Sequence, residues 1–266
     1  MRFALPAPPV VTGFYRMAFA AALMTGFLAL RRTPLSSFRP GAAAALVSGL
    51  CFGTDLALWQ TAVVKTSVAT ATVLVNTTPV TLGLWTVLVL GQRLAPRFVG
   101  GAAIAMLGTA VLLGISWDDV GDREGAWLAL AAAVFYTGYL LLMSAARRSA
   151  DALPAFFLAT IGATVALGSI AVVRGDPFTG FPATSWAAMV AAAVVSQIGG
   201  VFGIVWALRY VPATLASVVL LTQPVGTALL GWVILGEALD PVQSLGGVAV
   251  LAGIVLAARG PVQEPR

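Results

Sequence analysis

Long apolar runs dominate this chain and restrict the folds it can adopt. A helix needs about 20 apolar residues to cross roughly 30 Å of hydrocarbon. Charged residues make up only 9% of the chain, against about 25% in typical soluble domains. Nine runs have about the required length: 9–30, 41–62, 67–90, 98–115, 125–146, 153–173, 185–207, 212–235 and 242–258. The sequence therefore predicts an all-α polytopic membrane protein with nine transmembrane helices.

The first run is interpreted as a retained span rather than a cleaved signal peptide. It is longer than a signal core, it contains Arg16, and it is followed by Arg31 and Arg32 instead of a small-residue cleavage site.

Composition excludes several functions. The net charge is +5, but the basic residues stand singly or in pairs between apolar runs, which excludes a nucleic-acid patch. Histidine is absent, so His metal sites, Ser-His pairs and His proton relays are excluded. The lone Cys51 excludes an internal disulfide and is expected to be a small buried hydrophobe. No phosphate-binding loop is present, so ATP is not the direct energy source. No cofactor is expected.

The basic residues fix the predicted orientation. With the chain start outside, ten arginines face the cytoplasm, whereas Arg2, Lys65, Arg123 and Arg174 face outward. Membrane proteins carry an excess of basic residues in cytoplasmic loops. The sequence therefore predicts a cytoplasmic C-terminus.

One phrase occurs twice with its charge reversed. LGQRLAPR at 90–97 carries Arg93 and Arg97, whereas LGEALDPV at 235–242 carries Glu237 and Asp240. A shift of 145 residues aligns the two copies without a gap from residue 62 to about 112, and it matches these pairs among others: Thr77/Thr222, Pro79/Pro224, Gly91/Gly236, Pro96/Pro241, Gly101/Gly246 and Gly108/Gly253.

The two copies are predicted to cross the membrane in opposite directions. The third run corresponds to the eighth, and a displacement of five spans inverts the second copy. The phrase with arginines then lies on the cytoplasmic side, and the phrase with acidic residues lies on the outer side. This is the charge distribution that the positive-inside rule predicts for an inverted repeat. Inverted repeats are a recurring architecture of secondary transporters with a substrate site near mid-membrane.

The sequence resembles the EamA-type domains of the drug/metabolite transporter superfamily. In the first copy the resemblance rests on VVKTSVATATVL after Ala62, the mid-helix Pro79-Val80 and Leu90-Gly91-x-x-Leu94. In the second it rests on ALRYVPATLASVVLLTQPV and GEALDPVQSLGG. The resemblance implies two five-helix repeats in the plasma (inner) membrane. It also implies export or exchange of amino-acid-like or drug-like metabolites.

The sequence departs from the family pattern in two places. Gln92 stands where the family has Glu. The chain also begins at what resembles the family's second helix, which leaves nine spans instead of ten. Either the start codon is assigned too late or the first helix is lost, and a truncated gene model is the favoured interpretation. The predicted repeats are 1–115, lacking its first helix, and 125–260.

Two charged residues lie well inside predicted spans. A charge at a helix centre costs about 2.5–3.5 kcal/mol on insertion scales. At about 1.5 Å per residue, Arg16 lies about 10 Å and Asp55 about 9 Å from the outer ends of neighbouring spans. We expect them to pair beside a cavity open to the outside, with Asp55 binding a proton or a substrate amine. A purely structural pair, or no contact, are the alternatives.

Two mid-span prolines predict helix kinks. Pro79 and Pro224 each remove an intrahelical hydrogen bond. Asn76 and Gln223 stand beside them as candidate substrate-binding residues. The kinked helices either flank the pocket and flex during transport, or form static kinks satisfied by neighbouring hydroxyls.

The remaining candidates are polar or aromatic residues inside spans. Gln60 and Gln197 are expected to face the interior, because unpaired amides in hydrocarbon are costly. Trp59, Tyr136 and Trp206 are the predicted aromatic lining, with Tyr139 a further candidate and a membrane-interface position the alternative. Gly49-x-x-x-Gly53 and Gly199-x-x-x-Gly203 predict close helix packing.

The predicted function is a secondary transporter of small metabolites that works by alternating access, driven by protons or exchange. The alternatives are a channel, a non-transporting scaffold, and an intramembrane enzyme. Sparse polar groups disfavour a channel, and the absence of histidine together with a single mid-span carboxylate disfavours an enzyme. The predicted partners are a small-molecule substrate and the lipid bilayer, and a homodimer is left open.

Overall fold

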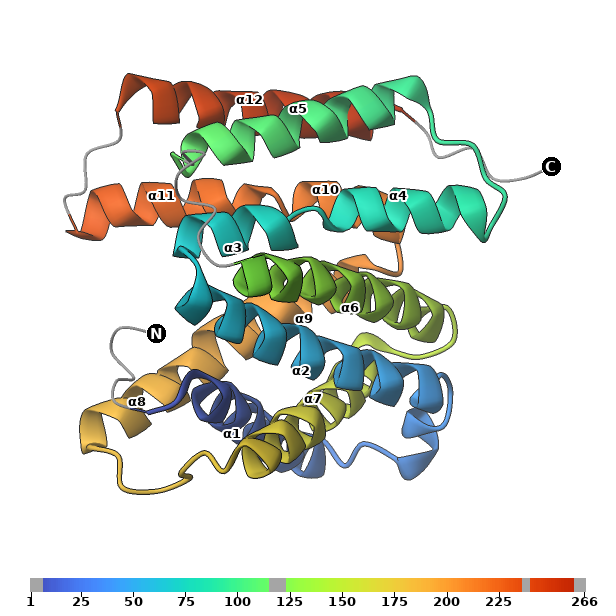
Figure 1. Cartoon of the computed structure of the whole chain (residues 1–266). Helices are drawn as coiled ribbons and strands as arrows, with labels where there is room; N and C mark the ends of the chain where they lie inside the picture. The colour runs from blue at the N-terminus through green and yellow to red at the C-terminus, as the bar shows by residue number, and fades with distance from the viewer. Residues whose placement is uncertain (1–6, 115–122, 236–239, 261–266) are drawn as a thin grey trace. The chain divides into compact units, whose positions relative to one another are not determined.

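The computed structural model describes residues 7–114, 123–235 and 240–260, and the described segments are helical, with no strand among them (Figure 1). Residues 236–239 of the repeat's second phrase, which include Glu237, lie outside the described residues. The helices are α1 (Pro9–Leu30), η2 (Leu35–Phe38), α2 (Ala42–Lys65), α3 (Val68–Val75), α4 (Thr78–Leu88), α5 (Pro96–Leu112), α6 (Arg123–Arg147), α7 (Ala152–Arg174), α8 (Ala183–Ala192), the π-helix η4 (Ala193–Val201), α9 (Phe202–Ala207), α10 (Ala213–Val219), α11 (Thr222–Leu235) and α12 (Pro241–Ala258).

Nine helical segments of the described chain suit a bilayer. Eight are long and apolar enough to cross it, and the ninth, Pro96–Leu112, is apolar but shorter. Three of the eight are composite, because α3 continues into α4, α8 into α9, and α10 into α11. The prediction of an all-α polytopic protein is confirmed.

The chain divides into two compact units that interleave its two halves. The first unit comprises Met1–Thr61 and Val134–Val211, and the second comprises Ala62–Ala133 and Pro212–Arg266. Each unit therefore combines helices that the 145-residue shift makes equivalent. In the first unit these are α1 and α7, and in the second they are α5 and α12.

In the second unit, α5 and α12 lie side by side and run antiparallel (Figure 1). A Cβ built on Gly101 would lie 2.5 Å from the carbonyl oxygen of Gly253, and one built on Gly108 would lie 2.8 Å from that of Gly246. The shift makes Gly101 equivalent to Gly246 and Gly108 equivalent to Gly253, so each contact is the mirror of the other. Equivalent helices thus meet about a local two-fold axis, the arrangement expected of an inverted repeat.

Both mid-span prolines follow a helix break. Helix α3 ends at Val75 and α4 begins at Thr78, where the Thr78 hydroxyl donates to the Val75 carbonyl at 2.7 Å. In the second copy the Thr222 hydroxyl donates to the Val219 carbonyl at 2.8 Å. These hydroxyls satisfy carbonyls exposed by the breaks. The local hydrogen bonding therefore suits the static interpretation of the kinks.

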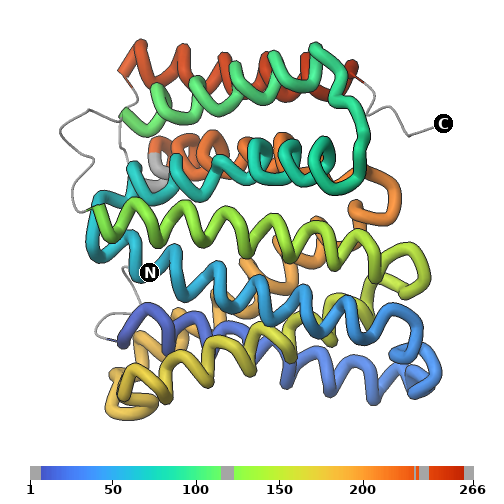
Figure 2. The backbone as a smooth tube through the Cα atoms, turned by 45° about the vertical axis from the view of Figure 1, so that its right-hand side comes forward, coloured from blue at the N-terminus to red at the C-terminus, as the bar shows by residue number. Residues whose placement is uncertain are grey.

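In the first unit, α1 and α7 pack side by side in opposite directions (Figure 2). A Cβ on Gly13 would lie 3.5 Å from Leu167, and one on Gly168 would lie 3.0 Å from the Phe14 ring. Helix α7 also approaches α2, where a Cβ on Gly53 would lie 2.7 Å from the carbonyl oxygen of Ala163.

The glycine pair Gly49/Gly53 packs closely on a neighbouring helix, whereas the pair Gly199/Gly203 does not. Gly49 packs directly on the Ala159 backbone, as the pattern in the second span predicts. The prediction of close packing at Gly199 and Gly203 is wrong for the described chain. A Cβ on Gly203 would meet nothing within 4 Å, and one on Gly199 would meet only the Val194 carbonyl of its own helix. Gly199 lies in the π-helical η4, and Gly203 lies in the helix α9 that follows it.

A buried arginine ties the end of α6 to the end of α9. The Arg147 side chain is 2% exposed, its Nε donates to the Val205 carbonyl at 2.9 Å, and its Nη1 donates to the Ala150 carbonyl. Helix ends leave carbonyls without intrahelical partners, and a guanidinium can satisfy two of them.

We expect Arg147→Ala to destabilise the protein by about 2–4 kcal/mol, because it removes two charge-assisted hydrogen bonds and leaves buried carbonyls unpaired. The measurement is unfolding in a mixed-detergent titration. The exposed neighbour Arg148 supplies the control, since Arg148→Ala should leave the midpoint unchanged. Equal midpoints for the two variants would contradict the assigned role of Arg147.

Candidate functional site

A cavity of about 670 Å³ lies in the first unit, between α1, α2, α8 and η4, and five of its lining residues carry polar side chains. This volume falls within the roughly 300–1,000 Å³ typical of small-molecule sites. One lining residue, Arg16, is charged, and the others are polar or small. The lining residues are Thr12, Gly13, Arg16, Gln60, Thr184, Ala187, Ala188, Ala191, Ala192 and Ser196.

Helical spacing explains the α1 wall. Thr12 and Gly13 stand four and three residues before Arg16, so all three lie on one face of the helix. The Nε of Arg16 is buried without a hydrogen-bond partner. An unpaired buried guanidinium nitrogen is a donor available to an anionic group that enters the cavity.

Gln60 forms the α2 wall. Its side chain is 1% exposed, and its Oε1 atom has no partner. A Cβ on Gly13 would lie 3.2 Å from the Gln60 amide nitrogen, so the missing side chain at Gly13 makes room for this amide. Gly13 thus lets a polar group of α2 reach the face that carries Arg16.

Asp55 lies deeper on the same helix, close enough to Arg16 for their charges to interact. Its side chain is 5% exposed and its Oδ1 has no hydrogen-bond partner. The described ion pairs within 4.0 Å do not include Arg16 and Asp55. The two residues therefore attract each other across a gap instead of closing a salt bridge.

An aromatic cluster lies near Asp55. Phe52 stacks on Tyr139 with ring centroids 4.8 Å apart, and Tyr136 lies 5.6 Å from Tyr139. Both tyrosines lie within electrostatic range of the Asp55 carboxyl. The Tyr139 hydroxyl is buried without a partner, and so is the Trp59 indole nitrogen one turn after Asp55.

Unsatisfied polar atoms concentrate in this unit. Buried polar groups in native proteins almost always have hydrogen-bond partners, and each exception requires an explanation such as water, an ion or a ligand. Seven buried atoms of the first unit have none: Arg16 Nε, Asp55 Oδ1, Trp59 Nε1, Gln60 Oε1, Tyr139 Oη, Asp176 Oδ2 and Gln197 Oε1. Water or a polar ligand is needed to satisfy them.

The sequence-predicted residues fall into three groups. Arg16, Asp55, Trp59 and Tyr136 belong to the first unit, where Arg16 lines the cavity and Asp55 interacts with Arg16 and with Tyr136. Gln197 is 2% exposed and follows Ser196, which lines the cavity. Asn76 and Gln223 belong to the second unit, beside the breaks before Pro79 and Pro224, and Gln223 is exposed.

Trp206 lies outside the lining of this cavity. Its side chain is 53% exposed and packs on Tyr210 with ring centroids 5.1 Å apart, and it is not among the residues that line the cavity. The π-helical η4 ends at Val201, and Trp206 lies in the helix α9 that follows it.

Sequence reasoning missed the α8 wall. Ala187, Ala188, Ala191 and Ala192 repeat at helical spacing and leave a face of small side chains. Such a face in a membrane helix is usually assigned to helix packing. The signal that could have found it is Thr184 at one end and Ser196 at the other.

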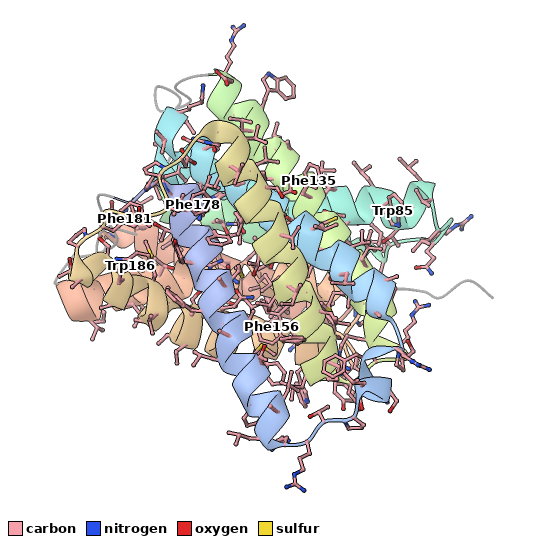
Figure 3. All side chains as sticks on the ribbon, turned by 90° about the horizontal axis from the view of Figure 1, so that it is seen from below. Trp85, Phe135, Phe156, Phe178, Phe181 and Trp186 are labelled. Atoms are coloured by element: carbon pink, nitrogen blue, oxygen red, sulfur yellow. The ribbon has the colours of Figure 1, made fainter. Side chains whose placement is uncertain are left out.

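Aromatic residues connect α1 to the segment before α8. The Tyr15 hydroxyl donates to the Phe178 carbonyl at 2.8 Å, and its ring lies 4.7 Å from that of Trp186. Phe181 also packs on Trp186, and Figure 3 shows Phe178, Phe181 and Trp186 gathered together. This cluster holds α1 and α8, two walls of the cavity, in register.

Comparison with known proteins identifies the family. The sequence model of the EamA-like transporter family matches residues 1–114 and 123–259. The chain belongs to the EamA-like transporter family. The resemblance drawn from the two sequence copies is thereby confirmed, and this EamA protein is a multi-pass membrane transporter rather than an enzyme.

Two relatives and a solved structure are similar to this chain over most of its length. A pseudopaline exporter from Pseudomonas aeruginosa is 26% identical over 96% of this chain and 87% of its own length. A Streptantibioticus cattleyicolor protein named "Probable terminal-alkyne amino-acid exporter" is 28% identical over 86% of this chain and 78% of its own. A crystal structure superposes with a TM-score of 0.76 at 23% identity, covering 96% of this chain and 90% of the other, which supports the fold alone.

Proposed function

We propose that this EamA protein exports a small amino-acid-like metabolite across the plasma membrane through the Arg16 cavity. The observation that carries the proposal is the one charged side chain among the lining residues, with an unpaired nitrogen, near a buried carboxyl. A cation and an acid in one polar region suit a zwitterion. The two relatives named as exporters of pseudopaline and of a terminal-alkyne amino acid support the same class.

Each polar residue has an assigned role. Arg16 binds the substrate carboxylate, since a guanidinium matches a carboxylate with two parallel hydrogen bonds. Gln60 orients the substrate with its unpaired amide oxygen. Asp55 binds either the substrate amine or a proton, because its Oδ1 is buried without a partner.

Transport is proposed to proceed by alternating access, with proton coupling or exchange as the energy source. The proposed orientation has a cytoplasmic C-terminus, as the distribution of basic residues predicts.

The test is saturable transport in proteoliposomes. Counterflow of labelled amino acids should saturate, and their methyl esters should compete poorly because they lack the carboxylate. Non-saturable flux, or equal competition by acids and esters, would contradict the proposal.

We expect Arg16→Gln to raise KM for the transported acid by about 10- to 150-fold, the effect of losing roughly 1.5–3 kcal/mol of charged hydrogen bonding. Methyl-ester competition should hardly change. The control is Arg39→Gln, which alters an exposed arginine outside the cavity lining and should leave KM unchanged. Parallel increases for acid and ester would assign Arg16 to folding instead of recognition.

A further inference from the structure

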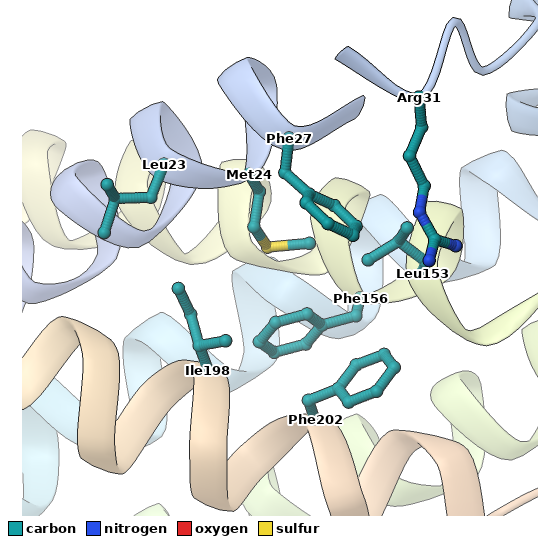
Figure 4. A pocket seen from close by; sticks show the side chains of 8 residues that line it. All are labelled: Leu23, Met24, Phe27, Arg31, Leu153, Phe156, Ile198 and Phe202. Carbon is teal, nitrogen blue, oxygen red and sulfur yellow. The ribbon is translucent and has the colours of Figure 1, made fainter. Parts of the chain in front are cut away.

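A second cavity in the first unit has a different chemical character. It has a volume of about 550 Å³ and shares no lining residue with the Arg16 cavity. Seven apolar side chains and one arginine form its walls (Figure 4): Leu23, Met24, Phe27, Arg31, Leu153, Phe156, Ile198 and Phe202. A polar metabolite would find almost no hydrogen-bond partners in it.

Three of the lining residues form a row along α1 and its C-terminal end. Leu23, Phe27 and Arg31 follow one another at intervals of four residues, so they lie on one face of the helix. At about 1.5 Å per residue this row extends over about 12 Å. Figure 4 shows the Arg31 side chain at one end of the cavity, with Leu23 toward the other. The shape is that of an apolar slot with a cation at its end.

The slot opens toward the surrounding medium. Leu23 is 48% and Phe27 44% exposed, and both belong to a helix long and apolar enough to span the membrane. Exposed apolar side chains in such a helix face lipid chains. A ligand can therefore enter sideways from the bilayer.

Arg31 is placed to bind an anionic head group. It directly follows the last residue of α1, and its guanidinium lies 4.8 Å from the centre of the Phe27 ring, which holds the charge above the slot. Arginines at span ends sit at the membrane–water interface. In the predicted orientation this end is cytoplasmic, where anionic lipids attract basic residues.

We propose that this slot is a binding site for an anionic phospholipid, with one acyl chain between α1, α7 and η4 and its phosphate on Arg31. The apolar walls match an acyl chain, the lateral opening matches a ligand that arrives from the bilayer, and the single cation matches a phosphate. The site is separate from the substrate cavity, so it stands independently of the proposed transport function.

The test compares thermal unfolding of the full chain in nanodiscs of phosphatidylcholine alone and in nanodiscs that also contain phosphatidylglycerol. The wild type should unfold at a higher temperature with phosphatidylglycerol and bind it about fivefold more tightly than phosphatidylcholine, the effect of one arginine at an anionic surface. Arg31→Gln should abolish this preference, whereas Arg39→Gln should keep it. An unchanged preference in Arg31→Gln would overturn the proposal.

Further experiments test whether a lipid acyl chain occupies the slot. Ile198→Trp fills the slot and should weaken binding of both lipids, whereas Val195→Trp, on an exposed face of η4, should not. Photo-crosslinking with a diazirine-tailed phosphatidylglycerol on the wild type should label peptides that contain Leu23 or Phe202, and labelling only elsewhere would refute the site. Equal stabilisation by inorganic phosphate in detergent would show an anion site without a lipid and would likewise overturn it.

Discussion

Asp55→Asn should abolish proton-driven export while leaving the protein folded and present in the membrane. Asn keeps the shape of the side chain but cannot take up and release a proton. Asp55 is 5% exposed and its Oδ1 has no hydrogen-bond partner, so the substitution removes no described hydrogen bond of that atom. We expect accumulation driven by a pH gradient to fall to background in proteoliposomes.

Exchange separates the two roles open to Asp55. If Asp55 carries the coupling proton, Asp55→Asn should retain exchange of labelled for unlabelled substrate without a gradient. If it binds the substrate amine, exchange should also be lost, and carboxylic acids without an amine should be transported equally by both proteins. Asp176→Asn is the control, since Asp176 pairs with Arg174 at 3.4 Å and does not line the cavity.

A structural pair makes a different prediction. If Arg16 and Asp55 only balance each other's charge, the double variant Arg16→Gln/Asp55→Asn should recover the activity that each single variant loses, as a double-mutant cycle would reveal. Functional roles predict that the double variant is as inactive as the worse single variant. Recovery, or an Asp55→Asn protein with normal gradient-driven transport, would remove Asp55 from the mechanism.

Gly101→Ala should be among the most destabilising small substitutions in the second unit. The added methyl group would lie 2.5 Å from the Gly253 carbonyl oxygen, and backbone atoms cannot move aside as a flexible side chain can. Forcing α5 and α12 apart should cost about 1–3 kcal/mol, as overpacking does. Because the contact is reciprocal, Gly253→Ala should have a similar effect.

The adjacent glycine is a matched control. A Cβ on Gly100 would meet nothing within 4 Å, so Gly100→Ala should be neutral or should stabilise α5 by up to about 1 kcal/mol through helix propensity. The measurement is unfolding in a mixed-detergent titration. Two variants with equal midpoints would show that the α5–α12 contact is looser than described.

The sequence predicted the features of this fold that depend on periodicity and on special backbone residues. Run length predicted nine spans, and Pro79 and Pro224 marked positions that directly follow helix breaks. The glycines at 101, 108, 246 and 253 were among the matching positions that indicated the repeat, and they are residues where α5 and α12 touch. Glycine and proline constrain the backbone directly, so their positions can be read without knowing the tertiary contacts.

The site was harder to predict, because which residues line a cavity depends on packing. Arg16 and Asp55 could be selected because a charge inside a membrane span is costly, so a charged residue there is expected to have a partner or a function. The alanines of α8 carry no such signal, because small residues equally suit helix packing. Trp206 was predicted as a lining residue; it lies outside the lining of this cavity, in the helix α9 that follows the π-helical segment 193–201.

The central claim is that the two sequence copies cross the membrane in opposite directions, and cysteine labelling tests it most directly. Arg93→Cys and Asp240→Cys, each in a Cys51→Ser background, place one thiol before α5 and one before α12, at exposed positions. In intact cells a membrane-impermeant maleimide should label Cys at 240 at once and Cys at 93 only after permeabilisation. Labelling of both thiols from the same side would contradict the inverted repeat and the transport mechanism built on it.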